Sequence, residues 1–389
     1  MENFELYNPT RILFGKDQFI RLPELLKEHI TGGKIMIAYG GGSVLQNGIL
    51  NRVKSHLNGH PFIAFGGIEP NPQYTTLMKG VELAREEGVT FILAVGGGSV
   101  IDGVKFMAGA FFYQGEAWDV LARKEGCVFN QALPFGCVLT LPATGSEANS
   151  GAVISRNEIG SKRTMGGPQF FPKFSLCDPT VVATLPKRQI ANGIIDAFTH
   201  TMEQYITFPT QNHLQERQAE AILSVLIEIA PVVLNDPSDY SSAANLMWCA
   251  TNALTGQLRC GVPTDWATHM IGHELTALYG IDHARTLAII APRLYENQFE
   301  NKKEKLAQYG KRIWGLAGND NQIGLEAIRK TEEFFHSLHV PTKLSEYTSD
   351  TDHAAEIIRN RFIERGWIAM GERQAITPDD VFAIVENSI

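Results

Sequence analysis

Five side chains in the second half of the chain are of the types that bind metals and transfer protons. They are Asp196, His200, His269, His273 and His283. Asp196 and His200 are four residues apart in a stretch predicted to be helical, residues 190–206, and His269 and His273 share that spacing. Residues i and i+4 lie on one face of a helix, so each pair can point toward one ion. One such pair is commonly structural, but two pairs and a further histidine favour a divalent-metal site with a proton carrier beside it.

The composition limits what this site can belong to. A chain of 389 residues is too long for one compact core and predicts two domains. With 44% hydrophobic and 20% charged residues it is typical of soluble globular proteins. A net charge of −8 argues against nucleic acid or an anionic membrane as partner. The five scattered cysteines and the absence of a signal-like start indicate reduced thiols in a cytoplasmic protein.

Short apolar runs alternate with amphipathic stretches in the first half. The runs are residues 34–39, 61–65, 90–95 and 135–141, and helical stretches are predicted at 45–57 and 74–87. Strands alternating with helices predict βαβ units, and therefore a parallel sheet covered on both faces. Residues 4–14 are predicted to add two short strands at the sheet edge, around Asn8-Pro9.

Helical periodicity replaces the strand pattern after Asp178-Pro179. The predicted helices are residues 190–206, 211–234, 243–258, 265–278, 283–297, 324–338 and 353–364. We therefore predict an α/β domain over residues 1–182 and an all-α domain over residues 183–389.

Two glycine-rich turns have the same sequence, GGGSV, at residues 40–44 and 96–100. Each follows a predicted strand and opens a predicted helix, where backbone N–H groups can bind a phosphate and glycines let a ligand approach closely. Neither turn is the G-x-G-x-x-G motif of ordinary dinucleotide folds, and tight packing is the alternative explanation for one such turn. Their repetition favours a nucleotide. A third loop, residues 140–150, is rich in hydroxyl side chains that can bind ribose or phosphate, or form a plain surface loop.

These segments resemble the iron-containing (group III) alcohol dehydrogenases along essentially the whole chain, and most closely the bacterial NADPH-dependent aldehyde reductases and butanol dehydrogenases. The similar segments include AVGGGSVIDG at 94–103, LPATGSEANSGAVISR at 142–156, IANGIIDAFTHTMEQY at 190–205 and VPTDWATHMIGHELTALYGIDHA at 262–284. The resemblance implies a dehydroquinate synthase-like fold, with a Rossmann-like dinucleotide-binding domain, a helical domain and a cleft between them. It also suggests a homodimer.

The resemblance assigns roles residue by residue. It implies that Asp196, His200, His269 and His283 are the metal ligands and that His273 is the additional active-site histidine. The implied cofactor-binding residues are Gly41, Gly42, Ser43, Asn71, Gly97, Gly98, Ser99, Asp102, Thr140, Ser146 and Lys162.

Two features near the first GGGSV turn bear on the choice of cofactor. Aldehyde reductases of this kind have lysines just after the first GGGSV, where this chain has Leu45 and Gln46. The family's NAD users tend to have an acidic residue near Gly41 or Gly42, which this chain lacks. Room for a 2′-phosphate favours NADP(H) over NAD(H). A third difference, Ala284 in place of a common glycine, is a subgroup trait.

Three imidazoles and one carboxylate suit Fe(II) or Zn(II), without distinguishing them. Such an ion polarises an aldehyde oxygen while the nicotinamide donates hydride to the carbon. His273 would supply the proton, directly or through water, or would only orient a metal ligand. We therefore predict a metal-dependent oxidoreductase that interconverts short- to medium-chain aldehydes and primary alcohols.

The alternatives are a lyase or cyclase of the same fold, a metal hydrolase, and a non-catalytic redox sensor or scaffold. A lyase or cyclase of this fold would need basic residues for a phosphorylated substrate, whereas Trp266, Met270, Leu275 and Leu278 suggest a small apolar one. A metal hydrolase would leave both glycine turns unexplained. A redox sensor or scaffold would not require the full ligand set.

Overall fold

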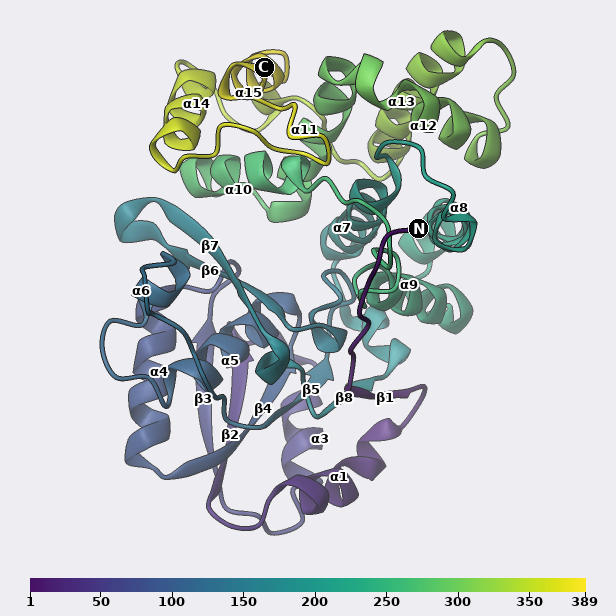
Figure 1. Cartoon of the computed structure of the whole chain (residues 1–389). Helices are drawn as coiled ribbons and strands as arrows, with labels where there is room; N and C mark the ends of the chain where they lie inside the picture. Colours follow the sequence, from purple (N-terminus) through teal and green to yellow (C-terminus); the bar gives the residue numbers. More distant parts are fainter. The chain divides into compact units, whose positions relative to one another are not determined.

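The computed structural model describes all 389 residues, which divide into two compact units. The first unit holds residues 7–186 and 236–251, and the second holds residues 1–6, 187–235 and 252–389. Figure 1 shows the strands of the first unit and the helices of the second. The predicted domain boundary at residues 182 and 183 falls within a 3-10 helix, η5 (Pro179–Thr184), and stays a prediction.

The strands are β1 (Arg11–Phe14), β2 (Lys34–Gly40), β3 (Phe62–Ile68), β4 (Val89–Gly96), β5 (Phe135–Leu139), β6 (Gly151–Arg156), β7 (Ser161–Gly166) and β8 (Phe174–Cys177). The helices are α1 (Leu22–His29), α2 (Ser43–Gln46), α3 (Ile49–Ser55), α4 (Tyr74–Glu86), α5 (Gly98–Ala110), α6 (Trp118–Leu121), α7 (Lys187–Tyr205), α8 (His213–Asn235), α9 (Tyr240–Ala253), α10 (Ala267–Tyr279), α11 (His283–Asn297), α12 (Phe299–Ile313), α13 (Asp320–Ser337), α14 (Ala354–Glu364) and α15 (Pro378–Glu386).

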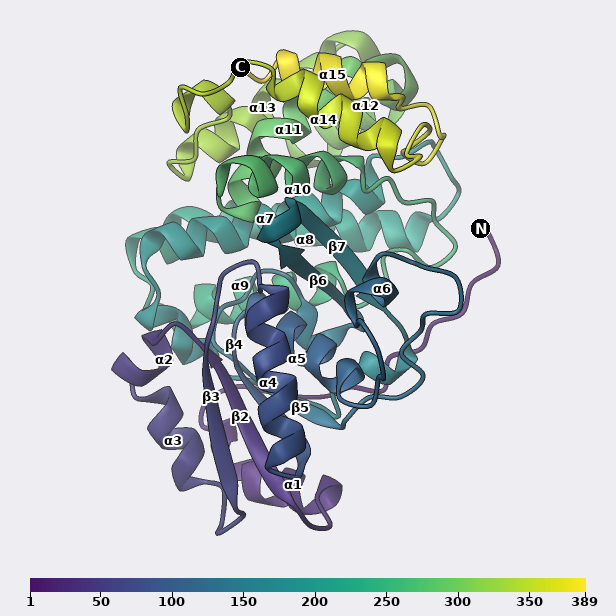
Figure 2. The same cartoon turned by 90° about the vertical axis from the view of Figure 1, so that its left-hand side faces the viewer.

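Six parallel strands form the sheet of the first unit, in the order β1-β8-β5-β4-β2-β3. The chain runs from β2 to β3 in one direction and then from β3 to β4 and β5 in the other. Because parallel crossovers are right-handed, this reversal places α3 and α4 on opposite faces of the sheet. Figure 2 shows α4 and α5 together in front of the strands. The predicted parallel α/β fold is confirmed.

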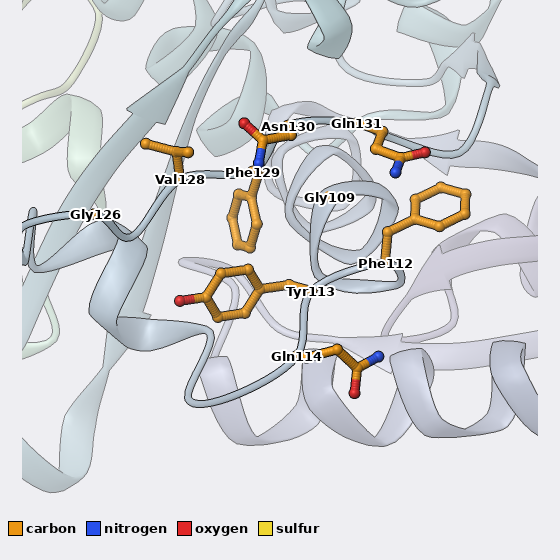
Figure 3. Close-up of a pocket in the computed structure, with 9 residues that line it drawn as sticks. All are labelled: Gly109, Phe112, Tyr113, Gln114, Gly126, Val128, Phe129, Asn130 and Gln131. Carbon is orange, nitrogen blue, oxygen red and sulfur yellow. The ribbon is translucent and has the colours of Figure 1, made fainter.

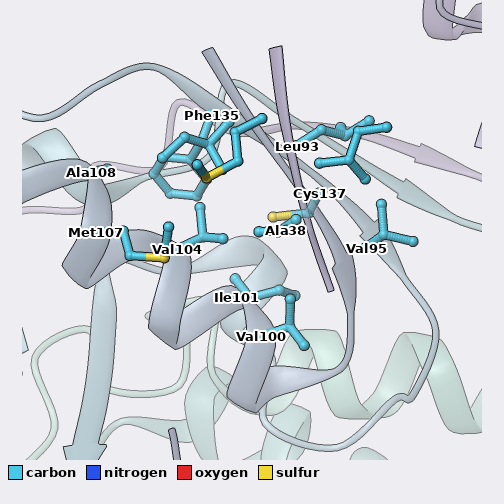
Figure 4. Packing of buried hydrophobic residues seen from close by; sticks show 14 of the residues in the cluster. Ala38, Leu93, Val95, Val100, Ile101, Val104, Met107, Ala108, Phe135 and Cys137 are labelled. Atoms are coloured by element: carbon cyan, nitrogen blue, oxygen red, sulfur yellow. The ribbon is translucent and has the colours of Figure 1, made fainter. Parts of the chain in front are cut away.

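The core of this unit lies between α5 and the middle strands. Ile101, Val104 and Met107 of α5 pack toward Leu93 of β4 and Phe135 of β5, and each is at most 1% exposed (Figure 4). Strands β4 and β5 are buried along nearly their whole length, and residues 35–38 in the middle of β2 are buried as well. This burial explains why their sequences are continuous apolar runs rather than alternating ones.

Several predicted elements differ from the structure. The single helix predicted at 45–57 is two helices, α2 and α3, because Gly48 adopts a positive φ of 77° between them. The first of the two N-terminal strands is wrong, since residues 1–10 contain no strand and only β1 joins the sheet edge. The β6–β7 hairpin, β8, α1, α6, α12 and α15 were not predicted.

The second unit is helical apart from one isolated bridge between Met370 and Ile376, which confirms the all-α prediction. By length and composition alone, α8 is apolar enough to cross a membrane, but core helices of soluble proteins pass the same test. Two of its carboxylates are buried in ion pairs, Glu216 with Lys305 and Glu220 with Arg312. These pairs indicate a helix that belongs to a folded protein core.

Candidate metal centre and nucleotide site

Three helices of the second unit carry the predicted metal ligands. Asp196 and His200 lie one turn apart on α7, His269 lies on α10, and His283 is the first residue of α11. Asp196, His200 and His269 are 3%, 5% and 7% exposed, so their polar atoms depend on one another rather than on water. Their ligand atoms form a compact group in which all lie within 4.8 Å of one another.

A single oxygen of Asp196 is the centre of this arrangement. Asp196 Oδ1 lies 3.9 Å from Nε2 of His200, 4.0 Å from Nε2 of His269 and 3.7 Å from Nε2 of His283. The same oxygen is buried and accepts no hydrogen bond. A buried carboxylate oxygen without a donor is costly unless a cation compensates it.

The donor set fits one divalent ion. Tetrahedral Zn–N bonds of about 2.1 Å separate neighbouring ligand atoms by about 3.4 Å, close to the distances from Asp196. Three imidazole nitrogens and one carboxylate oxygen match the preferences of Fe(II) and Zn(II). The structure thus brings all four predicted ligands together.

Sequence reasoning missed Glu203, which lies three residues after His200 on α7. Its Oε2 is hydrogen-bonded to His269 Nδ1, while Oε1 accepts hydrogen bonds from the backbone N–H groups of Thr268 at 2.7 Å and His269 at 3.3 Å. Burial, and then the Asp265 carboxylate, raise the pKa of Glu203 to about 8. Carboxylates in this position orient a metal-binding imidazole and fix which nitrogen faces the ion. An acidic residue one turn beyond a ligand was the available signal.

The start of α11 is fastened to α7 by a second polar network. Asp282 Oδ2 accepts hydrogen bonds from Arg188 and from Asn192, both at 2.9 Å. Arg285 in turn donates to Asn192 Oδ1 at 3.2 Å. These contacts flank His283 on both sides in the sequence and hold it beside α7. Its side chain remains 23% exposed, more than the other imidazole ligands.

His273 lies beside the ligands without belonging to their group. Its ring centroid is 5.0 Å from that of His283 and 6.2 Å from that of His269. It is half-buried, so a substrate or water can reach it. Of the apolar residues that suggested a small apolar substrate, Leu275 is fully buried in the core, whereas Trp266, Met270 and Leu278 are half-buried.

The two GGGSV turns follow adjacent strands of the sheet. β2 ends at Gly40 and β4 at Gly96, and these strands pair directly at the point where the strand order reverses. In parallel α/β sheets ligands bind beyond the carboxyl ends of the strands at such a reversal. The loop from Thr140 follows β5, the neighbour of β4 on the other side. Strand order thus gathers the loops predicted to bind the nucleotide.

Three predicted cofactor residues from distant segments meet at this edge. Asn71 follows β3, and its backbone N–H donates to Ser99 Oγ at 3.3 Å. Lys162 of β7 donates to Asn71 Oδ1 at 3.0 Å. Asn71 also adopts a positive φ of 57°, a conformation in which asparagine is enriched. The three residues form one polar cluster with a cation in it.

Asp102 and Ser146 form a second cluster with Lys105, which sequence reasoning missed. Ser146 Oγ donates to Asp102 Oδ1 at 2.6 Å, and the fully buried Lys105 ammonium contacts Ser146, Asn149 and Gly151. Desolvation lowers the pKa of Lys105 to about 8 and raises the pKa of Asp102. Ser146 is 2% exposed, so its hydroxyl fixes the loop from inside.

The glycines of the two turns have different reasons for lacking a side chain. A Cβ on Gly41 would meet nothing within 4 Å, whereas Gly42 has a φ of +124°. A Cβ on Gly98 would lie 2.4 Å from Thr144 Oγ1, and one on Gly97 would lie 3.0 Å from Leu141 Cβ. The first turn, with Ser43 opening α2, leaves open space, and the second is required for close packing on the 140–150 loop. Thr140, the first residue of that loop, joins the loop to the second turn, because its backbone N–H donates to the Gly96 carbonyl at 3.1 Å.

A cavity of about 250 Å³ lies elsewhere in the first unit (Figure 3). It lies at the C-terminal end of α5 and is lined by Gly109, residues 112–114, Gly126 and residues 128–131. The glycine turn is at the other end of this helix, roughly 18 Å away at 1.5 Å per residue. The cavity is therefore separate from the nucleotide loops.

Comparisons with known proteins agree with this arrangement. The iron-containing alcohol dehydrogenase family matches residues 9–179, and the C-terminal domain of the same family matches residues 190–389. The NADPH-dependent aldehyde reductase YqhD of Escherichia coli is 48% identical over 382 residues, 97% of each chain. NADH-dependent butanol dehydrogenase A of Clostridium acetobutylicum is 37% identical over the full length of both chains.

Solved structures show the same fold. The crystal structure of E. coli YqhD superposes with a TM-score of 0.96 at 47% identity, covering 100% of this chain and 99% of the other. NADH-dependent butanol dehydrogenase A from Thermotoga maritima gives a TM-score of 0.94 at 31% identity, with the same coverage.

Proposed function

Because this chain belongs to the iron-containing alcohol dehydrogenase family, we propose that it is a metal-dependent, NADP(H)-linked oxidoreductase that interconverts short- to medium-chain aldehydes and primary alcohols. The observation that carries the proposal is the buried Asp196 oxygen facing three histidine nitrogens at 3.7, 3.9 and 4.0 Å. Nothing else in the second unit combines a full ligand set with an uncompensated carboxylate oxygen in this way.

Asp196, His200, His269 and His283 would hold the ion, and Glu203 would orient His269. When bound, Fe(II) or Zn(II) would supply Lewis-acid polarisation of the aldehyde oxygen. The half-buried His273, whose ring centroid is 5.0 Å from that of His283, would hold the proton that the product alcohol gains, at an imidazole nitrogen. The alternative role for His273 is to orient a ligand ring.

The nucleotide would bind at the carboxyl edge of the sheet. Gly41, Gly42 and Ser43 would face the adenosine ribose, and Gly97, Gly98 and Ser99 the pyrophosphate at the start of α5. The cluster of Asn71 and Lys162, with Asp102, Thr140 and Ser146 behind the loop, supports this proposal.

The lyase alternative has no support among the relatives described above, which are reductases and dehydrogenases. The side chains next to the metal ligands also argue against a lyase. Trp266 and Met270 are apolar, whereas a phosphorylated substrate would require several cations there.

The test is oxidation of NADPH by butanal, followed by absorbance, with metal content measured on the same sample. Chelation should abolish turnover, and adding Fe(II) or Zn(II) should restore it. H269A should lower bound metal and turnover together while the fold remains. H213A is the matched control, because His213 is an exposed histidine at the start of α8 outside the ligand set. Equal metal content and activity in H269A and the wild type would reject the ligand assignment.

We also propose that residues 1–182 form the nucleotide-binding domain and residues 183–389 the metal-binding domain of a cytoplasmic homodimer. Support for the dimer comes from the family resemblance. Light scattering of the purified protein tests it: a mass of one chain at micromolar concentration would contradict the dimer without affecting the enzymatic proposal.

A further inference from the structure

Trp266 has a backbone conformation that a bulky residue seldom adopts. Its φ of 68° and ψ of 3° lie in the left-handed region, directly before α10. Such strain clusters at functional sites and persists only where the surroundings hold it in place.

Both neighbours of Trp266 are fixed. Asp265 accepts a hydrogen bond from Ala267 N–H at 2.8 Å and forms a buried ion pair with Lys302 at 2.6 Å. The backbone N–H of Asp265 donates to the carbonyl of Glu203 at 2.9 Å. The chain therefore enters α10 along a path tied to α7 and α12, and Trp266 has no freedom to relax its backbone.

The conformation places the indole against the metal ligands. Its ring centroid lies 5.5 Å from His269 and 6.1 Å from His200, with the rings at 68° and 60°. His273 contacts the ligand set from elsewhere, through His269 and His283. Trp266 and His273 thus share His269 as a neighbour, and each borders one further ligand, His200 for Trp266 and His283 for His273.

Exposure along the helix shows which side chains can meet a substrate. Between residues 266 and 276, Trp266, Met270 and His273 are half-buried, and all the others are buried. A spacing of three residues places Met270 and His273 on one face of α10, and Trp266 lies directly before the first residue of that helix. A substrate whose oxygen reaches the ligand group therefore lies next to this face, where two of the three side chains are apolar.

We propose that Trp266, with Met270 one turn along α10, forms the wall that contacts the carbon chain of the aldehyde and so determines chain-length preference. This proposal rests on the aldehyde-reducing function proposed above. His273 would lie beyond the wall, near the proton transfer, so recognition and chemistry are divided along one helix face.

The test uses linear aldehydes from propanal to octanal with the metal-loaded enzyme and NADPH. Burying one methylene corresponds to about a fourfold gain in kcat/KM. In the wild type, kcat/KM should therefore rise with chain length until the wall is covered. In W266A the hexanal-to-propanal ratio of kcat/KM should fall by at least about tenfold. W266F should give an intermediate ratio, and M270A should lower the ratio independently of Trp266.

The ratio separates specificity from a structural role. A loss of metal or of folded protein scales both aldehydes equally and leaves the ratio unchanged. W314A is the matched control, because Trp314 is a half-buried tryptophan of the same unit whose ring contacts Tyr309. An unchanged ratio in W266A and M270A would overturn the proposal, and if W266A does not fold, W266F and M270A decide it. If the wild type does not oxidise NADPH with any of these aldehydes, the result would instead reject the proposed function.

Discussion

At the scale of single residues, the candidate metal centre is recognisable by a buried carboxylate oxygen that no donor in the protein satisfies. Asp196 Oδ1 is buried and faces three imidazole nitrogens, yet receives no hydrogen bond. In an ordinary core, a carboxylate in that position would be paired with a donor. Glu203 gives the complementary evidence. It is hydrogen-bonded to Nδ1 of His269, which leaves Nε2 of the same ring facing Asp196.

His273 provides the first prediction. H273Q should retain the metal and bind NADPH normally, yet lower kcat by about 10²–10⁴-fold if His273 carries the proton. The measurement is kcat per bound metal, with metal content determined on the same preparation. Normal turnover per metal with weaker metal binding would instead identify His273 as a residue that orients a ligand.

Gly41 provides the second prediction. Its neighbourhood leaves room for a side chain, and unlike Gly42 it does not have a positive φ, so G41D should fold without backbone strain. A carboxylate there would repel a 2′-phosphate, and we expect kcat/KM to shift toward NADH by at least about tenfold relative to NADPH. G41S is the uncharged control. A wild type that already prefers NADH tenfold would show that the missing lysines at Leu45 and Gln46 outweigh the missing carboxylate.

At the scale of elements, the buried ammonium of Lys105 connects α5 to the loop predicted to bind the cofactor. It donates to the Ser146 carbonyl at 2.8 Å, the Ser146 hydroxyl at 2.7 Å, Asn149 at 3.0 Å and the Gly151 carbonyl at 2.7 Å. K105M should lower the free energy of unfolding by about 3 kcal/mol or more, because it removes the four hydrogen bonds of this ammonium and the cation that interacts most strongly with the Asp102 carboxylate. NADPH affinity, measured by fluorescence titration, should fall while metal content stays normal.

The pH dependence of this effect has a definite sign. Burial lowers the pKa of Lys105 from 10.5 to about 8, so between these values the unfolded chain holds a proton that the folded protein has released. The free energy of unfolding of the wild type should therefore rise with pH in that window relative to K105M. Denaturant titrations of both proteins at several pH values between 7 and 10 would measure it. Parallel pH profiles would contradict the shift.

The elements also show what the sequence could and could not predict. Strands β2, β4 and β5 were predicted because burial on both faces makes them continuous apolar runs. The β6–β7 hairpin was not, since half-exposed positions carry polar residues such as Arg156 and Arg163. α12 was missed because its apolar positions are few among charged ones, two of which, Lys302 and Lys305, are buried by pairing.

The candidate site, like the fold, could be predicted only in part from the sequence. Helical spacing placed Asp196 with His200, but no local pattern brings α10 and α11 to α7. The resemblance to a family supplied that set, and the structure then brought the four together. Strand order is likewise a property of long-range pairing, so adjacency of the two GGGSV turns could not be read from their repetition. Glu203 and Lys105 were missed because a buried charge resembles a surface one until its partners are known.

At the scale of the whole molecule, the two candidate binding sites lie in different units. The four metal ligands all belong to the unit of residues 1–6, 187–235 and 252–389, and the nucleotide loops all belong to the other. Each ligand therefore stabilises its own unit directly, by an amount that depends on concentration and affinity. This separation makes the two binding events distinguishable without measuring activity.

Hydrogen exchange of the purified protein should show the separation. At a metal concentration a thousand times Kd, binding contributes about 4 kcal/mol to the folded state. Chelation should therefore speed exchange of core amides in α7, α10 and α11 by up to about a thousandfold, while amides of β2, β4 and β5 change far less. Adding NADPH to the chelated protein should slow exchange at the loops following those strands and leave α10 fast.

In D196N, whose metal site lacks its carboxylate, chelation should have no further effect on α7, α10 and α11. Equal effects of chelation on both sets of elements would mean that the metal stabilises the molecule as one cooperative unit, and would contradict two separately stabilised units.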